Sequence, residues 1–203
     1  MCKRLALLSL LCLLPVKAEE ILIGGSESPD LKYEVYAVDN TDSGQPNLEL
    51  VEASTKKPII SLGGEGYSDN ARDLAFPENA SVEWNDKGDF FAVKARGTKT
   101  SFDVSLYRLT KGQISNIPLP NFWNAIKSHM ELQHGGRCYF ESIKEWKTDD
   151  LLVLNVSGST IDSSGISESD PEWYSYDITV NTFAKIIRIE EVKKGRLPSN
   201  GTE

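Results

Sequence analysis

The sequence predicts an all-β protein made of three antiparallel, blade-like sheets, with one short helix between the second and the third. Two observations carry this prediction. Short segments in which apolar and polar residues alternate with period two recur along the chain. They come in groups, and the order acidic turn, strand, strand, turn, strand occurs three times between residues 28 and 189. A recurring order of this kind is typical of repeat architectures.

We call these groups unit one, unit two and unit three. Each has three expected strands: 33–38, 47–53 and 58–62 in unit one, 89–95, 102–109 and 113–119 in unit two, and 151–156, 173–180 and 183–189 in unit three. Residues 151–156 are almost all apolar, which predicts a central strand. Asp30 and Asp86 lie 56 residues apart, and so do the turn residues Ser54 and Thr110. Unit three is longer because of residues 157–171, which we expect to form a polar surface loop.

One helix is expected at residues 121–134, between units two and three. Asn121 is a suitable N-cap, and glycines 135 and 136 end the segment. Its apolar stripe consists of Phe122, Ile126 and Met130. We therefore expect this helix to cover one end of the sheets. A second, shorter helical turn is expected at 68–74.

Residues 1–18 have the pattern of a signal peptide. A basic start is followed by an apolar run with seven leucines at 5–16, and small residues stand at Val16 and Ala18. The run is shorter than the ~20 apolar residues of a membrane span. We expect a secreted or periplasmic protein with a single β-repeat domain at 19–192, a disordered tail at 193–203 and no membrane insertion after cleavage. Cys138 is then the only cysteine left, expected to be buried as a small apolar residue, with an intermolecular disulfide as the alternative.

The charge excludes some partners. The net charge is −8, and it becomes −11 without the three cations of residues 1–18. Binding nucleic acid needs a basic footprint, and anionic membranes also repel such a surface. The acidity fits solubility in general, or a basic protein partner.

Two segments resemble the turn and strand of TolB-like and WD40-like β-propeller blades. They are Ser28-Pro29-Asp30-Leu31-Lys32-Tyr33 and the stretch 84–93, which begins Trp84-Asn85-Asp86-Lys87-Gly88. Leu31 departs from the blade pattern, which has glycine there. The resemblance implies a protein that scaffolds or binds other proteins. Propellers close with ~4–8 blades, so three units imply an open arc or a half-propeller that pairs, with a compact sandwich as the alternative.

Trp84 and Trp146 precede the repeat aspartates Asp86 and Asp149. We expect both tryptophans to cap the joints between neighbouring sheets. The aspartates are expected to close turns by accepting hydrogen bonds from backbone amides.

No metal or cofactor site is predicted. The two histidines and the remaining cysteine gather at His129, His134 and Cys138, but a spacing of five does not place both histidines on one helical face. Asp162, Glu168 and Asp170 are possible calcium ligands without an EF-hand loop around them.

No catalytic residues are predicted either. The chain has no Gly-x-Ser-x-Gly motif and no phosphate-binding glycine loop. Carboxylates that would suit a hydrolase are Glu83, Asp86, Glu141 and Glu145, but the sequence does not show whether any two face each other. Asn79, Asn155 and Asn200 stand in N-glycosylation patterns, which matter only in a eukaryotic secretory host.

The expected function is therefore a non-enzymatic protein-binding or scaffold role, with a protein partner or self-association. A small secreted hydrolase with an unrecognised carboxylate site is the alternative. A third hypothesis is an inhibitor or carrier that presents the 157–171 loop. Three units cannot close a ring, so their outer strands are expected to need cover from a partner or a second copy.

Overall fold

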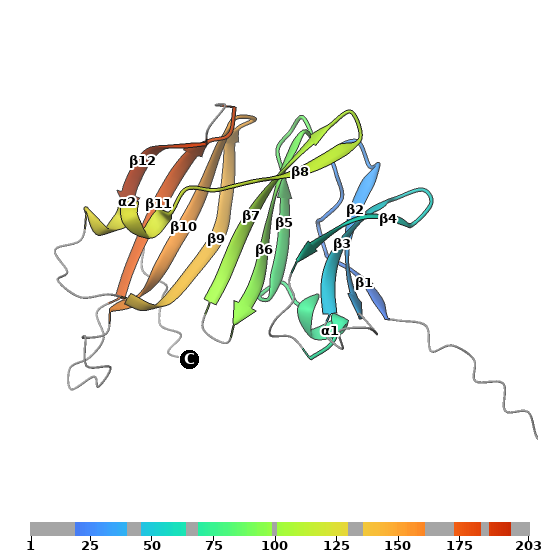
Figure 1. Ribbon diagram of the computed structural model, residues 1–203, viewed down its shortest axis with the longest axis horizontal. Helices are drawn as coiled ribbons and strands as arrows, with labels where there is room; N and C mark the ends of the chain where they lie inside the picture. Colours follow the sequence, from blue (N-terminus) through green and yellow to red (C-terminus); the bar gives the residue numbers. More distant parts are fainter. Residues whose placement is uncertain are drawn as a thin grey trace, which may run out of the picture.

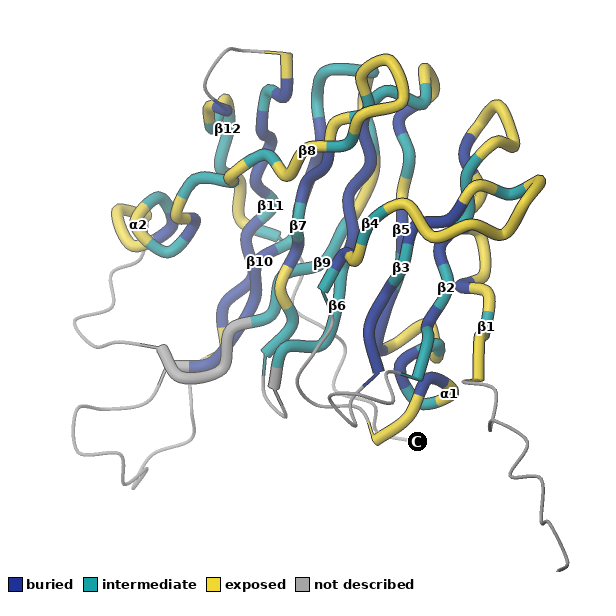
Figure 2. Tube along the Cα trace, turned by 45° about the vertical axis from the view of Figure 1, so that its right-hand side comes forward, coloured by how far each residue is buried: buried dark blue, intermediate teal, exposed yellow. Residues whose placement is uncertain are grey.

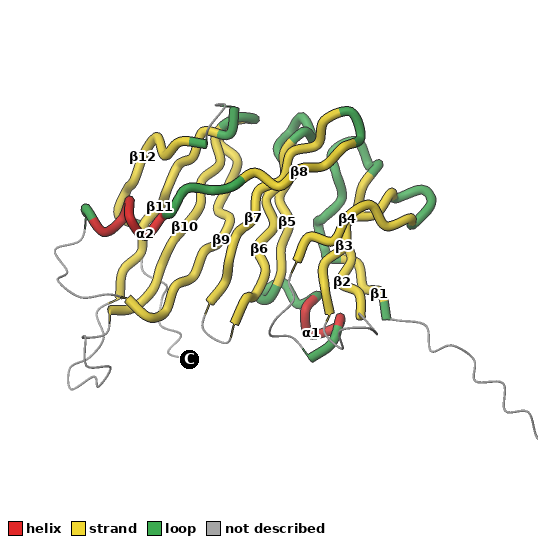
Figure 3. Tube along the Cα trace, viewed as in Figure 1, coloured by secondary structure: helices red, strands yellow, loops and turns green. Residues whose placement is uncertain are grey.

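The computed structural model describes residues 19–39, 46–63, 69–98, 101–129, 136–160, 173–183 and 187–195. Across these residues it has twelve strands and two short helices (Figure 1). Their order is β1 (Glu20–Leu22), β2 (Tyr33–Asp39), β3 (Pro46–Glu52), β4 (Lys57–Gly63), α1 (Ala71–Leu74), β5 (Ala80–Trp84), β6 (Phe90–Thr98), β7 (Ser101–Thr110), β8 (Gln113–Ile117), α2 (Phe122–Lys127), β9 (Gly136–Thr148), β10 (Leu151–Thr160), β11 (Trp173–Asn181) and β12 (Arg188–Lys194). The all-β fold class is confirmed, and the helices are minor elements at the margins of the sheets (Figure 3).

Each unit is an antiparallel meander of four strands: β1–β4, β5–β8 and β9–β12. Unit one is a sheet of its own. Units two and three are joined by a short parallel pairing of β7 with β9, in which Ser101 faces Tyr139 and Phe102 faces Phe140. Figure 1 shows the units side by side as a fan, from β1–β4 at the right to β9–β12 at the left. The described strands therefore form an open arrangement of three blade-like meanders.

The prediction missed the first strand of every unit. β1 is only three residues long, and β5 is five. β9 has thirteen residues, but its charged Lys144, Glu145 and Lys147 are exposed, which hides the period-two pattern. Each of these strands forms backbone hydrogen bonds with the strand that follows it. Its formation therefore depends on this pairing more than on alternation of apolar and polar residues in its own sequence.

Three predicted boundaries in the second half of the chain are corrected. The helix expected at 121–134 ends at Lys127 with Ser128 as its C-cap, and residues 130–135, with Met130, lie outside the described residues. Residues 157–160, expected in a loop, continue β10, because their backbone pairs with β9 along its whole length and with β11 as far as Ser159. The rest of that loop, 161–172, is outside the described residues. The last strand starts at Arg188 and runs through Lys194, so Lys193 and Lys194, expected in the tail, pair with β11.

Unit two lies between the other units because its central strand is buried on both faces. Phe90 and Ala92 of β6 belong to a core cluster with unit three and α2, whereas Phe91 and Val93 belong to a cluster with unit one and α1. The first cluster contains Leu152, Leu154, Val156, Ile178 and Val180 of unit three, and the second contains Val35, Ala37, Leu48 and Leu50 of unit one. Neither cluster joins unit one to unit three, which fits an open arc and not a sandwich of these two units. Helix α2 covers the end of the first cluster with Phe122 and Ile126, as expected.

The two tryptophans occupy equivalent places in the two joints. The Trp84 indole N–H donates to the carbonyl of Ser26 in unit one at 2.9 Å. The Trp146 indole N–H donates to the carbonyl of Glu83 in unit two at 3.2 Å. The prediction that both cap joints between sheets is confirmed.

The turns before β2 and β6 close in a different way from the prediction. Ser28 Oγ accepts from the backbone N–H of Lys32 and Tyr33 at 3.1 and 3.0 Å. Asn85 Oδ1 accepts from the N–H of Asp89 and Phe90 at 3.1 and 3.0 Å. Ser28 and Asn85 thus play the same part and lie 57 residues apart, one more than the spacing of the aspartates.

The repeat aspartates have other partners. Asp30 assists its own turn by accepting from Lys32 N–H at 3.2 Å. Asp149 accepts from Lys87 N–H at 3.2 Å, across the joint between units two and three. Only Asp30 therefore fits the predicted role of closing its own turn through a backbone amide.

Candidate functional site

The structure separates the residues that the sequence singled out. His129 is exposed just after α2, and its backbone carbonyl accepts from the Tyr176 hydroxyl at 3.2 Å. His134 and the side chain of Cys138 lie outside the described residues, as do Asp162, Glu168 and Asp170. Among the side chains that are described, no three of His, Cys, Asp or Glu are grouped in a way that would hold a metal ion.

The four candidate hydrolase carboxylates are distributed over two units. Glu83 is on β5, Asp86 is in the turn after it, and Glu141 and Glu145 are on β9. Glu141 accepts from the backbone N–H of Val104 at 2.9 Å, which stabilises the contact between β7 and β9.

The glycosylation patterns at Asn79 and Asn155 involve side chains that are already engaged. The Asn79 amide donates to the carbonyl of Asp73 at 2.8 Å, and its oxygen accepts from Arg96 at 3.1 Å. The Asn155 amide donates to Ser175 and Asp177, both at 2.9 Å. Asn200 is outside the described residues.

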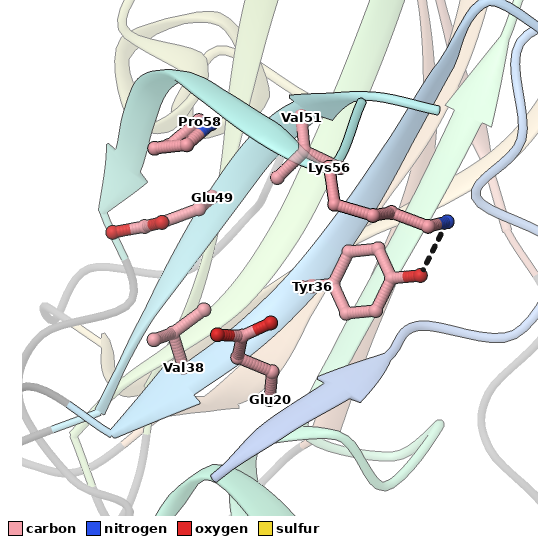
Figure 4. A pocket seen from close by; sticks show the side chains of 7 residues that line it. All are labelled: Glu20, Tyr36, Val38, Glu49, Val51, Lys56 and Pro58. Carbon is pink, nitrogen blue, oxygen red and sulfur yellow. Dashed lines mark hydrogen bonds between the residues drawn. The ribbon is translucent and has the colours of Figure 1, made fainter. Parts of the chain in front are cut away.

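The candidate site lies on the side of unit one that faces away from the core. Because Val35 and Ala37 of β2 and Leu48 and Leu50 of β3 point into the core, the residues between them point outward. We call this surface the unit one outer face. It contains a hollow of 260 Å³, lined by Glu20, Tyr36, Val38, Glu49, Val51, Lys56 and Pro58 (Figure 4).

The two edge strands of unit one are among the least covered parts of the protein, whereas β3 is largely buried. β4 is mostly exposed, and β1 is exposed at both ends (Figure 2). Leu22 and Ile59, on these two strands, are exposed by 38% and 41%. Apolar side chains and carboxylates therefore share one accessible surface.

One side of the hollow holds an internal cation. Lys56 donates to the Tyr36 hydroxyl at 2.9 Å and lies 5.2 Å from the centre of the Tyr36 ring. It also forms an ion pair with Glu34, to which Tyr36 donates at 3.0 Å. The Lys56 ammonium lowers the pKa of the Glu34 carboxyl, and Glu34 and Tyr36 raise the pKa of Lys56. Glu34 therefore stays ionised and Lys56 stays protonated at neutral pH.

The other side of the hollow is acidic and apolar. Figure 4 shows Glu49, Val38 and Glu20 across from Tyr36 and Lys56. Glu49 accepts from the Asn47 amide at 3.4 Å, a long hydrogen bond from a neutral donor. Asn47 is 5% exposed, and its Oδ1 atom has no hydrogen-bond partner among the described residues. Glu20 and Glu49, which line the hollow, therefore make this side acidic.

Sequence reasoning did not find this face, although one signal was present. In β2 the outward positions are Glu34, Tyr36 and Val38, so an aromatic and an aliphatic residue stand where a solvent-facing strand would have polar ones. Beyond Glu34, residues 35–38 of this strand are therefore apolar or aromatic on both faces. This pattern indicates a second surface that gains from cover.

Comparison with known proteins adds little. No family model matches the chain, and no curated protein sequence matches it. Among solved structures, hydrazine synthase of Kuenenia stuttgartiensis is similar over 85% of this chain and 58% of its own, with 12% identity and a TM-score of 0.37. The YpeB C-terminal domain of Bacillus megaterium is similar over 91% of this chain and 92% of its own, with 12% identity and a TM-score of 0.22. The chain thus spans just over half the length of the first of these structures, and neither likeness supports a functional argument.

Among the described residues, no helix is both long and apolar enough to cross a bilayer.

Proposed function

We propose that the chain is a secreted or periplasmic, non-enzymatic protein-binding module, and that the unit one outer face is its docking surface. The observation that carries this proposal is that apolar side chains and carboxylates lie together in that face. Tyr36, Val38 and Pro58 supply apolar contact area, and the carboxylates of Glu20 and Glu49 lie beside them. Interfaces combine an apolar centre with polar groups at the rim in the same way.

The hollow is at the small end of the range for ligand pockets. Pockets for small molecules enclose ~300–1,000 Å³, and this hollow of 260 Å³ lies near the lower limit of that range. It suits a single side chain of a larger partner. The acidic net charge of −8 would speed the approach of a basic protein.

A photo-crosslinking amino acid in place of Val38 tests the proposal in the native host. Irradiation should give a discrete adduct with another protein or with a second copy of the chain. The matched control carries the same crosslinker in place of Glu145, an exposed residue on β9 of unit three. Adducts of equal yield from both positions, or none from position 38, would exclude docking at this face.

A small hydrolase remains the second candidate because the hollow has two carboxylates, Glu20 and Glu49, along its lining. Retaining and inverting glycosidases both use a carboxylate pair. A panel of chromogenic glycosides separates the two functions. Turnover that Glu49→Gln abolishes would establish the hydrolase, whereas a binding module turns over none of them.

A further inference from the structure

The unit one outer face already shows how it holds a cation. The Lys56 ammonium is bound by a carboxylate, a phenol hydroxyl and an aromatic ring, all from neighbouring positions of β2. Cation–π contact and a charge-assisted hydrogen bond are the same interactions that recognise basic side chains in protein complexes. One half of the hollow is therefore a cation site filled from within the chain.

The opposite half of the hollow also presents a carboxylate, but β2 and β3 contain no lysine or arginine that could pair with it. The Glu49 carboxylate is bonded only weakly, through the 3.4 Å contact with Asn47. A donor that enters the hollow would pair with Glu49, which lines it.

We infer that this half of the hollow takes an arginine or lysine side chain from an extended segment of a different protein. Its aliphatic stem would lie on Val38, Val51 and Pro58, and its cationic head would bond Glu49. Arginine suits the site best, because its guanidinium presents five donors in a rigid fork. The inference rests on the proposed function and names the chemistry of its partner.

A second copy of the chain is a poorer source of this cation. Each copy carries a net charge of −8, so two copies repel each other. A basic segment of another protein is attracted by the same charge.

The test uses the purified full chain and an acetylated, amidated octapeptide of alternating threonine and arginine. Its counterpart replaces every arginine by glutamate. Amide chemical shifts recorded during titration should saturate with the arginine peptide, with the changes centred on β2 and β3, and should not respond to the glutamate peptide. Raising the salt concentration should weaken binding, because exposed charges are screened.

Glu49→Gln keeps the shape of the side chain and should raise the Kd about fivefold, as expected for loss of one partly exposed ion pair. The matched control is Glu190→Gln, on the exposed edge strand β12, which should change the Kd less than about twofold. Equal losses in both variants would mean that general acidity alone attracts the peptide, and absence of saturation would overturn the inference. Self-association of the protein, measured by sedimentation and lost in Glu49→Gln, would make a second copy the occupant instead.

Failure here is distinguishable from failure of the proposed function. If crosslinking through position 38 still captures a partner while the arginine peptide does not bind, the docking face stands and the basic partner is wrong. If neither experiment gives a signal, both proposals fall.

Discussion

The two end units present different surfaces to the outside. The outward side of unit three is polar, with Asn155 and Ser157 on β10 and Ser175, Asp177 and Thr179 on β11. The outward side of unit one has the partly exposed Tyr36 and Val38 and the buried Val51 beside glutamates. Both units are four-stranded antiparallel meanders, so the difference lies in the side chains at the outward positions and not in the backbone.

The polar face of unit three is satisfied internally. The Asn155 amide donates to Ser175 Oγ and to Asp177, and Lys144 forms an ion pair with Asp177. Gly195 packs against this face, since a Cβ added there would lie 2.7 Å from Ser175 Oγ and 3.0 Å from the amide nitrogen of Asn155. Ser157 and Ser175 are consequently buried. One end of the fan is closed by its own hydrogen bonds, and the other keeps an accessible hollow.

The largest expected effect is on unit three. Asp177→Ala should lower the free energy of unfolding by about 2 kcal/mol, because it removes the acceptor of Lys144 and one of the acceptors of the Asn155 amide. The matched change on unit one, Glu49→Ala, should cost less than about 0.5 kcal/mol. Urea unfolding of both variants measures the difference. Equal costs would remove the contrast between a structural face and a binding face.

The joints between the units should also respond unequally to loss of their tryptophans. Each of Trp84→Phe and Trp146→Phe removes one hydrogen bond to the neighbouring unit, worth about 1 kcal/mol. Trp84 also stacks on Phe91, with ring centres 4.3 Å apart. Trp146 makes a looser, tilted contact with Phe90 at 6.4 Å. Thermal unfolding should therefore show the larger loss for Trp84→Phe, and the reverse order would contradict this account of the joints.

The pH dependence of stability should come partly from Asp177. Burial alone would raise the pKa of this carboxyl, but the hydrogen bonds from Lys144 and Asn155 outweigh burial and lower it. A carboxyl whose pKa is lowered in the folded state stabilises the fold above its unfolded pKa, which is near 3.8. That stability is lost as the pH falls through the folded pKa.

Urea unfolding of the protein at a series of pH values below 5 should therefore show a decline that Asp177→Asn makes shallower. Glu190→Gln is the control, and it should leave the decline unchanged. A slope that is the same in Asp177→Asn and in the unaltered protein would show that the Lys144–Asp177 pair does not contribute.

The smallest expected effect compares the equivalent turns of units one and two. Leu31 and Gly88 occupy the same turn position and both have positive φ, 58° and 70°. Leu31 is 72% exposed, so it gains little from burial. Leu31→Gly should stabilise the protein by about 0.5 kcal/mol by removing left-handed strain. Gly88→Leu should destabilise it, because a Cβ there would lie 3.3 Å from Pro29 Cδ. In thermal unfolding, the melting temperature should rise in Leu31→Gly and fall in Gly88→Leu.

Much of the fold was predictable from local patterns. Period-two alternation located the later strands of each unit, and the Asn121 cap with Phe122 and Ile126 located α2. The opening strands β1, β5 and β9 escaped because each relies on the next strand for its backbone partners. Residues 157–160 escaped for a related reason: their polar composition is typical of a loop, yet their backbone pairs with neighbouring strands that are distant in the sequence.

The candidate site was less predictable than the fold. Glu34, Tyr36 and Lys56 are close only because β2 and the turn before β4 lie together in unit one. Glu20 and Glu49 line one hollow because β1 and β3 flank β2 on either side. No spacing in the chain reveals such a grouping, since it depends on which strands are neighbours.

The sequence by itself determined the all-β class, the three successive meanders and the tryptophans at their joints, because these depend on alternation and turn chemistry within short segments. Tertiary structure alone decided which outward faces are closed and which is accessible. That outcome depends on pairing and packing between residues far apart in the chain, as between Asn155 and Asp177 on one face and Tyr36 and Lys56 on the other.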